Sequence, residues 1–314
     1  MLKRHHQRKY VTLNYPGSKS GDKTLLTGIR GNLISGFFDP QNGITTSFIH
    51  NGYFHNLNHP QQNAVTNLYS PNQIKNCKTI QVVGNYNIGS GNAIGCLYEG
   101  LLDGSGDWQD IIPSGVGNIK DVICHSIMGG LIVGNLNTIE DPTLSKAFIY
   151  DLKRHASYSI TYPDAISITA YGIWYNCEDL YTICGGLELN NNKKFAYVVD
   201  WDNDTKTFRH WQLYNFNNDP VKALETHFNG ITGAKNGYHL TGDWFGISQE
   251  SKAGFFAIVK RNKHGGFKKN AIWTPVSFPD SELTSGNSVY QDIVIGVYTD
   301  FADDNVNGYV SFLE

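Results

Sequence analysis

The chain has 314 residues, a formal net charge of −3 at pH 7, and 17% charged residues against the ~25% of an average soluble protein. Its 33 glycines and few charges suit strands and turns better than long surface helices. Its slightly negative net charge is also unsuited to binding the phosphate backbone of a nucleic acid. No apolar run approaches the ~18 residues of a membrane-spanning helix, so we expect neither a nucleic-acid partner nor a membrane span.

The N-terminus divides into a basic tail, residues 1–8, and a short alternating segment, residues 9–16, which reads as a strand. No apolar stretch of signal-peptide length follows the tail. The five cysteines are odd in number, contain no Cys-x-x-Cys pair and lie mostly in apolar runs, as expected of reduced, buried thiols. These features predict a cytoplasmic protein, although export without a signal peptide would look the same.

A short apolar run that carries a glycine recurs six times along the chain. Successive glycines lie 48 to 57 residues apart, and the gap from the last glycine through the two termini to the first is again 54 residues. The six glycines are Gly36, Gly84, Gly134, Gly185, Gly242 and Gly296. An evenly spaced repeat that closes on itself indicates a ring of similar units.

Each glycine run is followed by a second apolar run and then by a more polar segment that ends at a proline. With the segment that precedes the glycine, this makes four strands per repeat. The last repeat ends at Glu314 without its polar strand, and residues 9–16 resemble the missing piece. The expected blades cover approximately residues 24–60, 63–113, 118–163, 166–220, 223–279, and 283–314 together with 9–16.

These observations predict an all-β, single-domain protein over residues 1–314. The predicted fold is a six-bladed β-propeller with four antiparallel strands per blade, closed by an N-terminal strand that completes the last C-terminal blade. A single four-stranded sheet cannot bury its own faces, so neighbouring sheets must cover them and the ring must close.

The repeats resemble those of the HAF family, whose members are described as extracellular repeat proteins. The resemblance rests on Ile132-Val-Gly134-Asn-Leu136, Val82-Val-Gly84-Asn-Tyr86 and Ala147-Phe-Ile-Tyr150. It covers most of the chain, and the fourth and fifth repeats depart from it. The resemblance implies a propeller and implies no reaction, because that family offers no catalytic signature to transfer.

Propellers bind ligands where their innermost strands converge on the central channel. Aligning the segments before the glycine runs places one polar residue of each repeat at the same level. This ring consists of Thr27, Asn67, His125, Tyr171, Asn229 and Asn287, with His227 close to Asn229. The alternative is that these side chains only cap or turn the backbone.

If the ring faces the channel, its neutral amides, hydroxyl and phenol suit a sugar or another polyol. We therefore expect a monomeric binding module for a small polar ligand, such as a glycan, or for a protein partner. A hydrolase or lyase that uses His125 and Tyr171 as acid and base is the alternative, and a non-catalytic scaffold is a third. The ring has no carboxylate that would orient the histidine, which counts against an enzyme.

Metal-binding patterns are weak, and we expect no cofactor other than a possible calcium ion. Asp303, Asn305 and Asn307 alternate as oxygen donors before a strand, and Asp200, Asp202 and Asp204 do the same between two strands. His50, His55 and His59 are too widely spaced in a hairpin to share a metal easily. Four tryptophans on outer strands fit either a sugar-stacking face or the packing between blades: Trp108, Trp201, Trp211 and Trp273.

Overall fold

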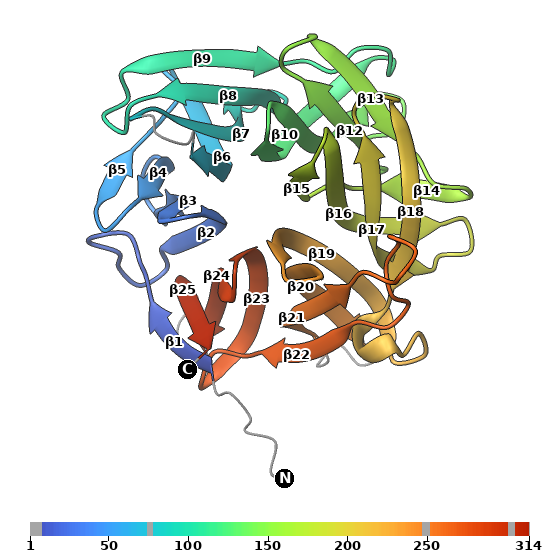
Figure 1. Ribbon diagram of the computed structural model, residues 1–314. Coiled ribbons are helices and arrows are strands. Elements are labelled where there is room, and N and C mark those ends of the chain that lie inside the picture. Colours follow the sequence, from blue (N-terminus) through green and yellow to red (C-terminus); the bar gives the residue numbers. More distant parts are fainter. Residues whose placement is uncertain (1–7, 74–77, 247–251, 301–304, 314) are drawn as a thin grey trace.

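The computed structural model describes residues 8–73, 78–246, 252–300 and 305–313. It is built almost entirely of antiparallel β-sheets that stand around a central axis, with the innermost strand of each sheet nearest that axis (Figure 1). This arrangement is a β-propeller. None of the helices in the described part of the chain is long and apolar enough to cross a membrane.

The two inner strands of each repeat correspond to the segments before and at the glycine runs. The innermost strands are β2 (Lys23–Arg30), β6 (Ala64–Gln73), β10 (Ile119–Met128), β14 (Ala165–Ile168) with β15 (Gly172–Cys177), β19 (Ala223–Ala234) and β23 (Ser281–Tyr290). The second strands are β3 (Leu33–Asp39), β7 (Ile80–Ile88), β11 (Leu131–Thr138), β16 (Leu180–Leu189), β20 (Gly237–Gly246) and β24 (Ile293–Asp300).

The two outer strands of each repeat follow in chain order, except that the outermost strand of the last repeat is the N-terminal β1. The third strands are β4 (Thr46–His50), β8 (Ile94–Gly100), β12 (Lys146–Asp151), β17 (Lys194–Asp202), β21 (Lys252–Lys260) and β25 (Val306–Leu313). The outermost are β5 (Phe54–Asn56), β9 (Gly106–Ile111), β13 (Ala156–Ile160), β18 (Thr207–Tyr214), β22 (Ile272–Val276) and β1 (Arg8–Thr12). A short 3₁₀ helix, η1 (Phe216–Asn218), follows β18.

The prediction of six separate sheets is corrected by the hydrogen bonding. Four blades are separate sheets, each of four or five strands, and the remaining strands form one eight-stranded sheet, β23-β24-β25-β2-β3-β4-β5 with β1 on β25. The two arms of that sheet are joined by a single parallel pair, Lys23 with Val306. The merger occurs because β2 follows the N-terminal segment that runs along β25, so the start of β2 lies beside the start of β25.

The N-terminal strand closes the ring, as the sequence predicted. β1 pairs antiparallel with β25 from Arg8–Leu313 to Thr12–Tyr309, and the Leu13 amide continues the pairing by donating to the Gly308 carbonyl at 2.8 Å. The strand is shorter than the predicted segment 9–16 and begins one residue earlier, at Arg8. The first and last described parts of the chain are therefore held in one sheet.

The six repeated glycines have a common physical cause. A Cβ at any of them would lie 1.8 to 2.2 Å from a backbone carbonyl oxygen of the innermost segment, far inside van der Waals contact distance. The six carbonyls belong to Leu25, Asn67, Ile123, Thr169, His227 and Ser285. Only glycine permits this close approach of two strands, which is why the residue recurs in every repeat.

Each innermost strand is irregular two residues beyond that carbonyl. In β2, β10, β19 and β23 the register shifts around one residue that has no partner on the second strand, while β6 has two such residues and the fourth sheet is interrupted between β14 and β15. A β-bulge bends a strand and redirects its side chain. The redirected positions are Thr27, Tyr69, His125, Tyr171, Asn229 and Asn287.

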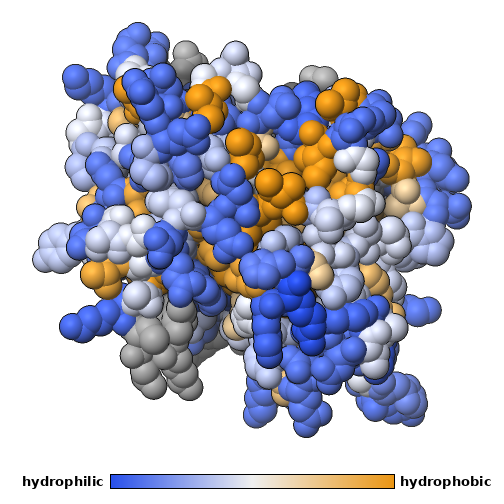
Figure 2. Space-filling model, turned by 90° about the horizontal axis from the view of Figure 1, so that it is seen from above, coloured by the Kyte–Doolittle hydropathy of each residue, from blue (hydrophilic) through white to orange (hydrophobic). Residues whose placement is uncertain are grey.

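The hydrophobic core lies between adjacent sheets and not at the axis. Buried clusters combine residues of neighbouring blades, such as Val198 of β17 with Phe228 of β19. Trp201 is buried in such a cluster, and Trp108, Trp211 and Trp273 pack against others. The tryptophans therefore fill the gaps between blades and do not form a sugar-stacking face. Figure 2 shows that one edge of the ring is mostly hydrophilic, with one group of apolar residues in its middle.

Candidate functional site at the central channel

A cavity of about 190 Å³ lies on the propeller axis, and every innermost strand contributes to its wall. Its lining consists of Leu25, Thr27, Phe37, Tyr69, His125, Tyr171, Asn229 and Asn287. Five of the seven residues predicted to bind ligand are therefore together around one cavity. The bulges described above place them there.

Asn67 and His227 do not line this cavity. Asn67 is paired with Asn85 in the regular part of the β6–β7 ladder, and Tyr69 occupies the bulged position two residues later. The sequence alignment therefore chose Asn67, two residues before the position that lines the cavity. The glycine contacts identify the correct residue. The carbonyl that faces Gly84 belongs to Asn67, two residues before Tyr69, just as the carbonyl that faces Gly134 belongs to Ile123, two residues before His125.

His125 is held as a neutral imidazole. The Asn135 Oδ1 atom accepts a hydrogen bond from the Ala170 amide at 2.8 Å, so the Asn135 Nδ2 group must donate to His125 Nε2, 3.0 Å away. The proton of the ring then lies on Nδ1. Burial, with a smaller effect of His227, lowers the pKa of His125 to about 3.

Three aromatic rings form one side of the cavity. His125 stacks on Tyr171 with ring centroids 3.8 Å apart and meets the edge of Tyr69 at 4.9 Å. Burial raises the pKa of both phenols, which stay protonated at neutral pH. Within the described residues, neither phenol hydroxyl has a hydrogen-bond partner. This side of the ring therefore offers unused hydroxyls beside apolar ring surface.

The other three ring residues are bonded to the neighbouring blade. Each donates to the carbonyl that immediately precedes the next ring residue along the ring. The bonds run from Asn229 to Gly286 at 3.0 Å, from Asn287 to Leu26 at 2.8 Å and from Thr27 to Leu68 at 2.6 Å. These side chains link neighbouring blades, a role that differs from the local capping or turning of the backbone considered above.

Sequence reasoning missed the carboxylate of this region, Asp243. Its Oδ2 atom accepts from Asn229 Nδ2 at 2.7 Å, and its Oδ1 atom accepts from the Gly286 amide at 3.1 Å. Asn229 Oδ1 in turn accepts from His227 Nδ1, and His227 Nε2 meets the Thr169 hydroxyl at 2.6 Å. The only signal in the sequence was position: Asp243 directly follows the repeated Gly242, as Asn135 directly follows the repeated Gly134.

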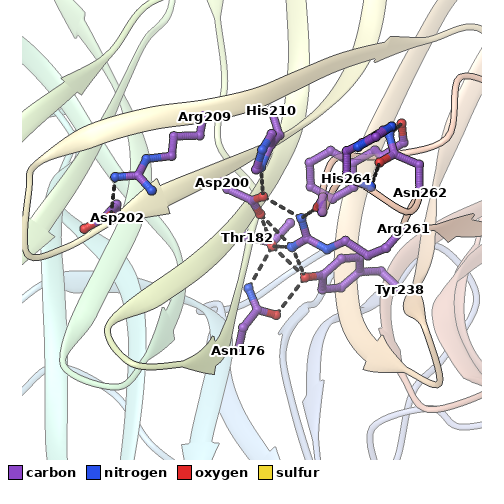
Figure 3. A network of polar contacts seen from close by, with 12 residues as sticks. Asn176, Thr182, Asp200, Asp202, Arg209, His210, Tyr238, Arg261, Asn262 and His264 are labelled. Carbon is purple, nitrogen blue, oxygen red and sulfur yellow. Dashed lines mark hydrogen bonds and ion pairs between the residues drawn. The ribbon is translucent and has the colours of Figure 1, made fainter.

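A second polar network lies away from the axis, between the fourth and fifth blades (Figure 3). Both carboxylate oxygens of the fully buried Asp200 accept from the guanidinium of Arg261, and His210 Nδ1 lies 2.9 Å from Oδ2. Thr182 donates to Asp200, and Tyr238 accepts from Arg261. The network pairs one buried charge completely and joins two blades, so we assign it a structural role.

The candidate metal ligands are engaged elsewhere. Both oxygens of Asp200 accept hydrogen bonds from Arg261 in the network above, and Asp202 forms an ion pair with Arg209. Asn305 Oδ1 accepts from the Gly21 amide and Asn307 Oδ1 accepts from Asn14, while Asp303 lies outside the described residues.

The three histidines of the first outer strands do not converge. His50 contacts the ring of Phe54, His55 bonds to Asn51, and His59 stacks on Tyr86. Within the described residues no group of three metal-binding side chains occurs.

No family model matches the chain, and no curated protein matches it. The resemblance to HAF repeats therefore stays a prediction. Among solved structures, the chain is similar to an arabinanase of Bacillus subtilis, with 10% identity over 77% of this chain and 92% of the other and a TM-score of 0.42. It is also similar to a neuraminidase-like protein of A/little yellow-shouldered bat/Guatemala/060/2010, with 11% identity over 98% of both chains and a TM-score of 0.47.

The SapL1 lectin in complex with alpha methyl fucoside is similar as well, with 12% identity over 91% of both chains and a TM-score of 0.47. Likenesses at this level carry no argument about function. The propeller is established by the sheets of the chain itself, and its function has to be argued from the channel.

Proposed function

We propose that the protein is a binding module that holds a small neutral polyol, such as a glycan, in the axial cavity. The observation that carries this proposal is the pair of phenol hydroxyls, Tyr69 and Tyr171, that line a cavity and have no partner among the described residues. Sites for small molecules combine apolar walls with a few polar groups that can form hydrogen bonds to the ligand. A sugar presents both kinds of surface, and a cavity of about 190 Å³ has room for a small one.

The state of His125 supports binding over catalysis. Its low pKa leaves no proton to donate as imidazolium at neutral pH, and its Nε2 lone pair is already used by Asn135. Its Nδ1 atom carries the remaining proton, so neither nitrogen is free to act as a base. The Nδ1 proton is instead a third donor for a bound hydroxyl or ring oxygen.

The two arms of the eight-stranded sheet act as two blades in this proposal, which gives six blades around the cavity. One pair of residues joins the arms, whereas each arm has its own repeated glycine and its own bulge. The support is that each of the six innermost strands supplies its own residue to the cavity wall.

The experiment is glycan-array screening followed by calorimetric titration of the best binder. Tyr171→Phe and Tyr69→Phe are expected to weaken binding about tenfold each, because each loses one hydrogen bond to the ligand. Tyr175→Phe is the matched control, since Tyr175 lies on the same strand as Gly172 but outside the cavity.

Equal affinity of the three variants and the wild-type protein would contradict the proposal. So would turnover of an ester, lactone or uronide substrate that disappears in His125→Phe, because the hydrolase or lyase alternative predicts that result.

A further inference from the structure

A second, smaller cavity lies on the axis beside the ring of redirected residues. It measures about 10 Å³, which is room for one water-sized particle. All six innermost strands line it, and four redirected residues of the larger cavity also line this one: Thr27, His125, Tyr171 and Asn229. The other lining residues are Ile231, Arg30 and the residues that directly follow the redirected positions: Ser70, Ser126, Gly172, Gly230 and Ser288. These following residues are small because neighbouring strands approach one another closely here. A Cβ at Gly230, for example, would meet the Ser288 backbone.

Arg30, the last residue of β2, places an unpaired guanidinium at this cavity. The residue is 8% exposed, and its buried Nε and Nη1 atoms have no hydrogen-bond partner among the described residues. Its guanidinium lies over the ring of Trp174, 5.0 Å from the centroid. The aromatic face attracts the cation, but it accepts no conventional hydrogen bond from those nitrogens.

The charge of Arg30 is also uncompensated. Burial lowers its pKa to about 10, against a smaller opposing effect of Tyr290, so the side chain stays cationic at neutral pH. In the part of the chain that the structure describes, no carboxylate forms an ion pair with it. His125 nearby is neutral. A buried cation with no counterion and with two unpaired nitrogens among the described residues is unfavourable, so the site calls for an anionic partner.

Three serine hydroxyls complete the donor set around the cavity. Among the residues that the structure describes, the Ser126 hydroxyl reaches only the Ser70 oxygen, at 3.5 Å, and the Ser70 hydroxyl donates only to the Pro71 carbonyl, at 3.4 Å. The Ser288 oxygen accepts a long bond from the Ile29 amide at 3.4 Å. Bonds of this length are weak, so these hydroxyl protons are available to a better acceptor.

We propose that this cavity holds a single chloride ion between the guanidinium of Arg30 and the serine hydroxyls. Residues that carry N–H and O–H donors line it, the local charge is positive, and a volume of about 10 Å³ has no room for a carboxylate or phosphate group. The ion would neutralise Arg30 and join the six innermost strands at the axis. The inference rests on Arg30 and the serines, which do not line the larger cavity of the polyol site, although the two cavities share Thr27, His125, Tyr171 and Asn229.

The test compares thermal unfolding in sodium chloride and in sodium gluconate at equal ionic strength. Gluconate is too large for the cavity, so any difference reports a bound halide. The melting temperature is expected to rise by about 2 °C for each tenfold increase in chloride above its dissociation constant, because the ion binds only the folded state. Equal melting temperatures in the two salts would overturn the proposal and leave a water molecule in the cavity.

Arg30→Met is the decisive variant. It keeps a long side chain against Trp174 and removes the charge, so it is expected to fold and to lose the chloride response. Arg209→Met is the control, because Arg209 is exposed and pairs with Asp202 on an outer strand. A chloride response that persists in Arg30→Met would contradict the assignment.

Two further measurements keep the proposal testable if Arg30→Met does not fold. Ser126→Ala retains the charge and removes one donor, and it is expected to shift the chloride midpoint to higher concentration. Crystals grown in sodium bromide are expected to show one anomalous peak on the axis beside Arg30. A peak elsewhere, or none on the axis, would overturn the assignment. Glycan titrations of the same variants are expected to stay unchanged.

Discussion

The ring around the channel has two halves that use the same backbone geometry differently. In one half, the side chains of Thr27, Asn229 and Asn287 donate hydrogen bonds to carbonyls of the neighbouring blade. In the other half, Tyr69 and Tyr171 contact His125 through their rings and leave their hydroxyls unpaired among the described residues. A β-bulge at an equivalent place thus provides either a link between blades or a surface for a ligand, according to the side chain it redirects.

The largest effect should be common to both halves, because the glycine contact is common to both. Gly134→Ala and Gly242→Ala each place a Cβ against a carbonyl oxygen of the innermost strand and are expected to cost about 3 kcal/mol or more in the free energy of unfolding. Gly266→Ala is the control, since its nearest neighbour is the movable end of Asn262. Chemical denaturation measures all three, and a mild effect in only one half would break the equivalence.

The next effect belongs to the aromatic half and depends on pH. The folded-state pKa of His125, about 3, lies below the ~6.5 of an unfolded histidine, so the unfolded chain binds the extra proton between these values. Stability is full above pH 6.5 and falls as the pH decreases, by about 2 kcal/mol from pH 7 to pH 5.

His227, whose pKa burial also lowers, contributes in the same direction. Unfolding free energies measured at both pH values in the wild-type protein and in His125→Phe test the effect. The variant is expected to lose about 2 kcal/mol of the pH dependence and to retain the remainder. An unchanged dependence would mean that His125 is not held neutral.

The half of the ring that links blades, formed by Thr27, Asn229 and Asn287, is tested by Asn287→Ala. The substitution leaves the Leu26 carbonyl without its donor and is expected to cost about 1.5 kcal/mol in the free energy of unfolding. Denaturant titration at pH 7 measures it. A loss of glycan affinity without a loss of stability would show instead that Asn287 belongs to the ligand-facing half.

The smallest effect on stability is expected from Tyr69→Phe. The hydroxyl has no partner among the described residues, so its removal should change the free energy of unfolding by less than about 0.5 kcal/mol while weakening ligand binding. A large loss of stability would place Tyr69 with the linking residues and remove the distinction between the halves.

Much of the fold was predictable from the sequence, because its cause is local and repeated. The spacing of the six glycines and the unfinished last repeat indicated a closed ring of sheets, and β1 indeed completes the sheet of β25. The pattern could not show that one pair, Lys23 with Val306, merges two arms into one sheet. A hydrogen bond between strands distant in sequence leaves no periodic signal.

The candidate site was predicted less completely. Thr27, His125, Tyr171, Asn229 and Asn287 were found because each begins a polar–small–apolar triplet before a glycine run. Asn67 was chosen in place of Tyr69, which lies in the wider bulge of β6. Asp243, Asn135 and Arg30 belong to no recognisable motif, since each also contacts a residue of another blade: Gly286, Ala170 and Trp174, respectively.

The sequence by itself determined that strands repeat, that glycine is required where two strands approach, and which short segments reach the channel. These are properties of neighbouring residues and of backbone sterics. The tertiary structure alone decided which polar groups are paired, that His125 is neutral and that Arg30 is left without a counterion. Those outcomes depend on distances between residues of different blades, and burial gives each unpaired group its energetic weight.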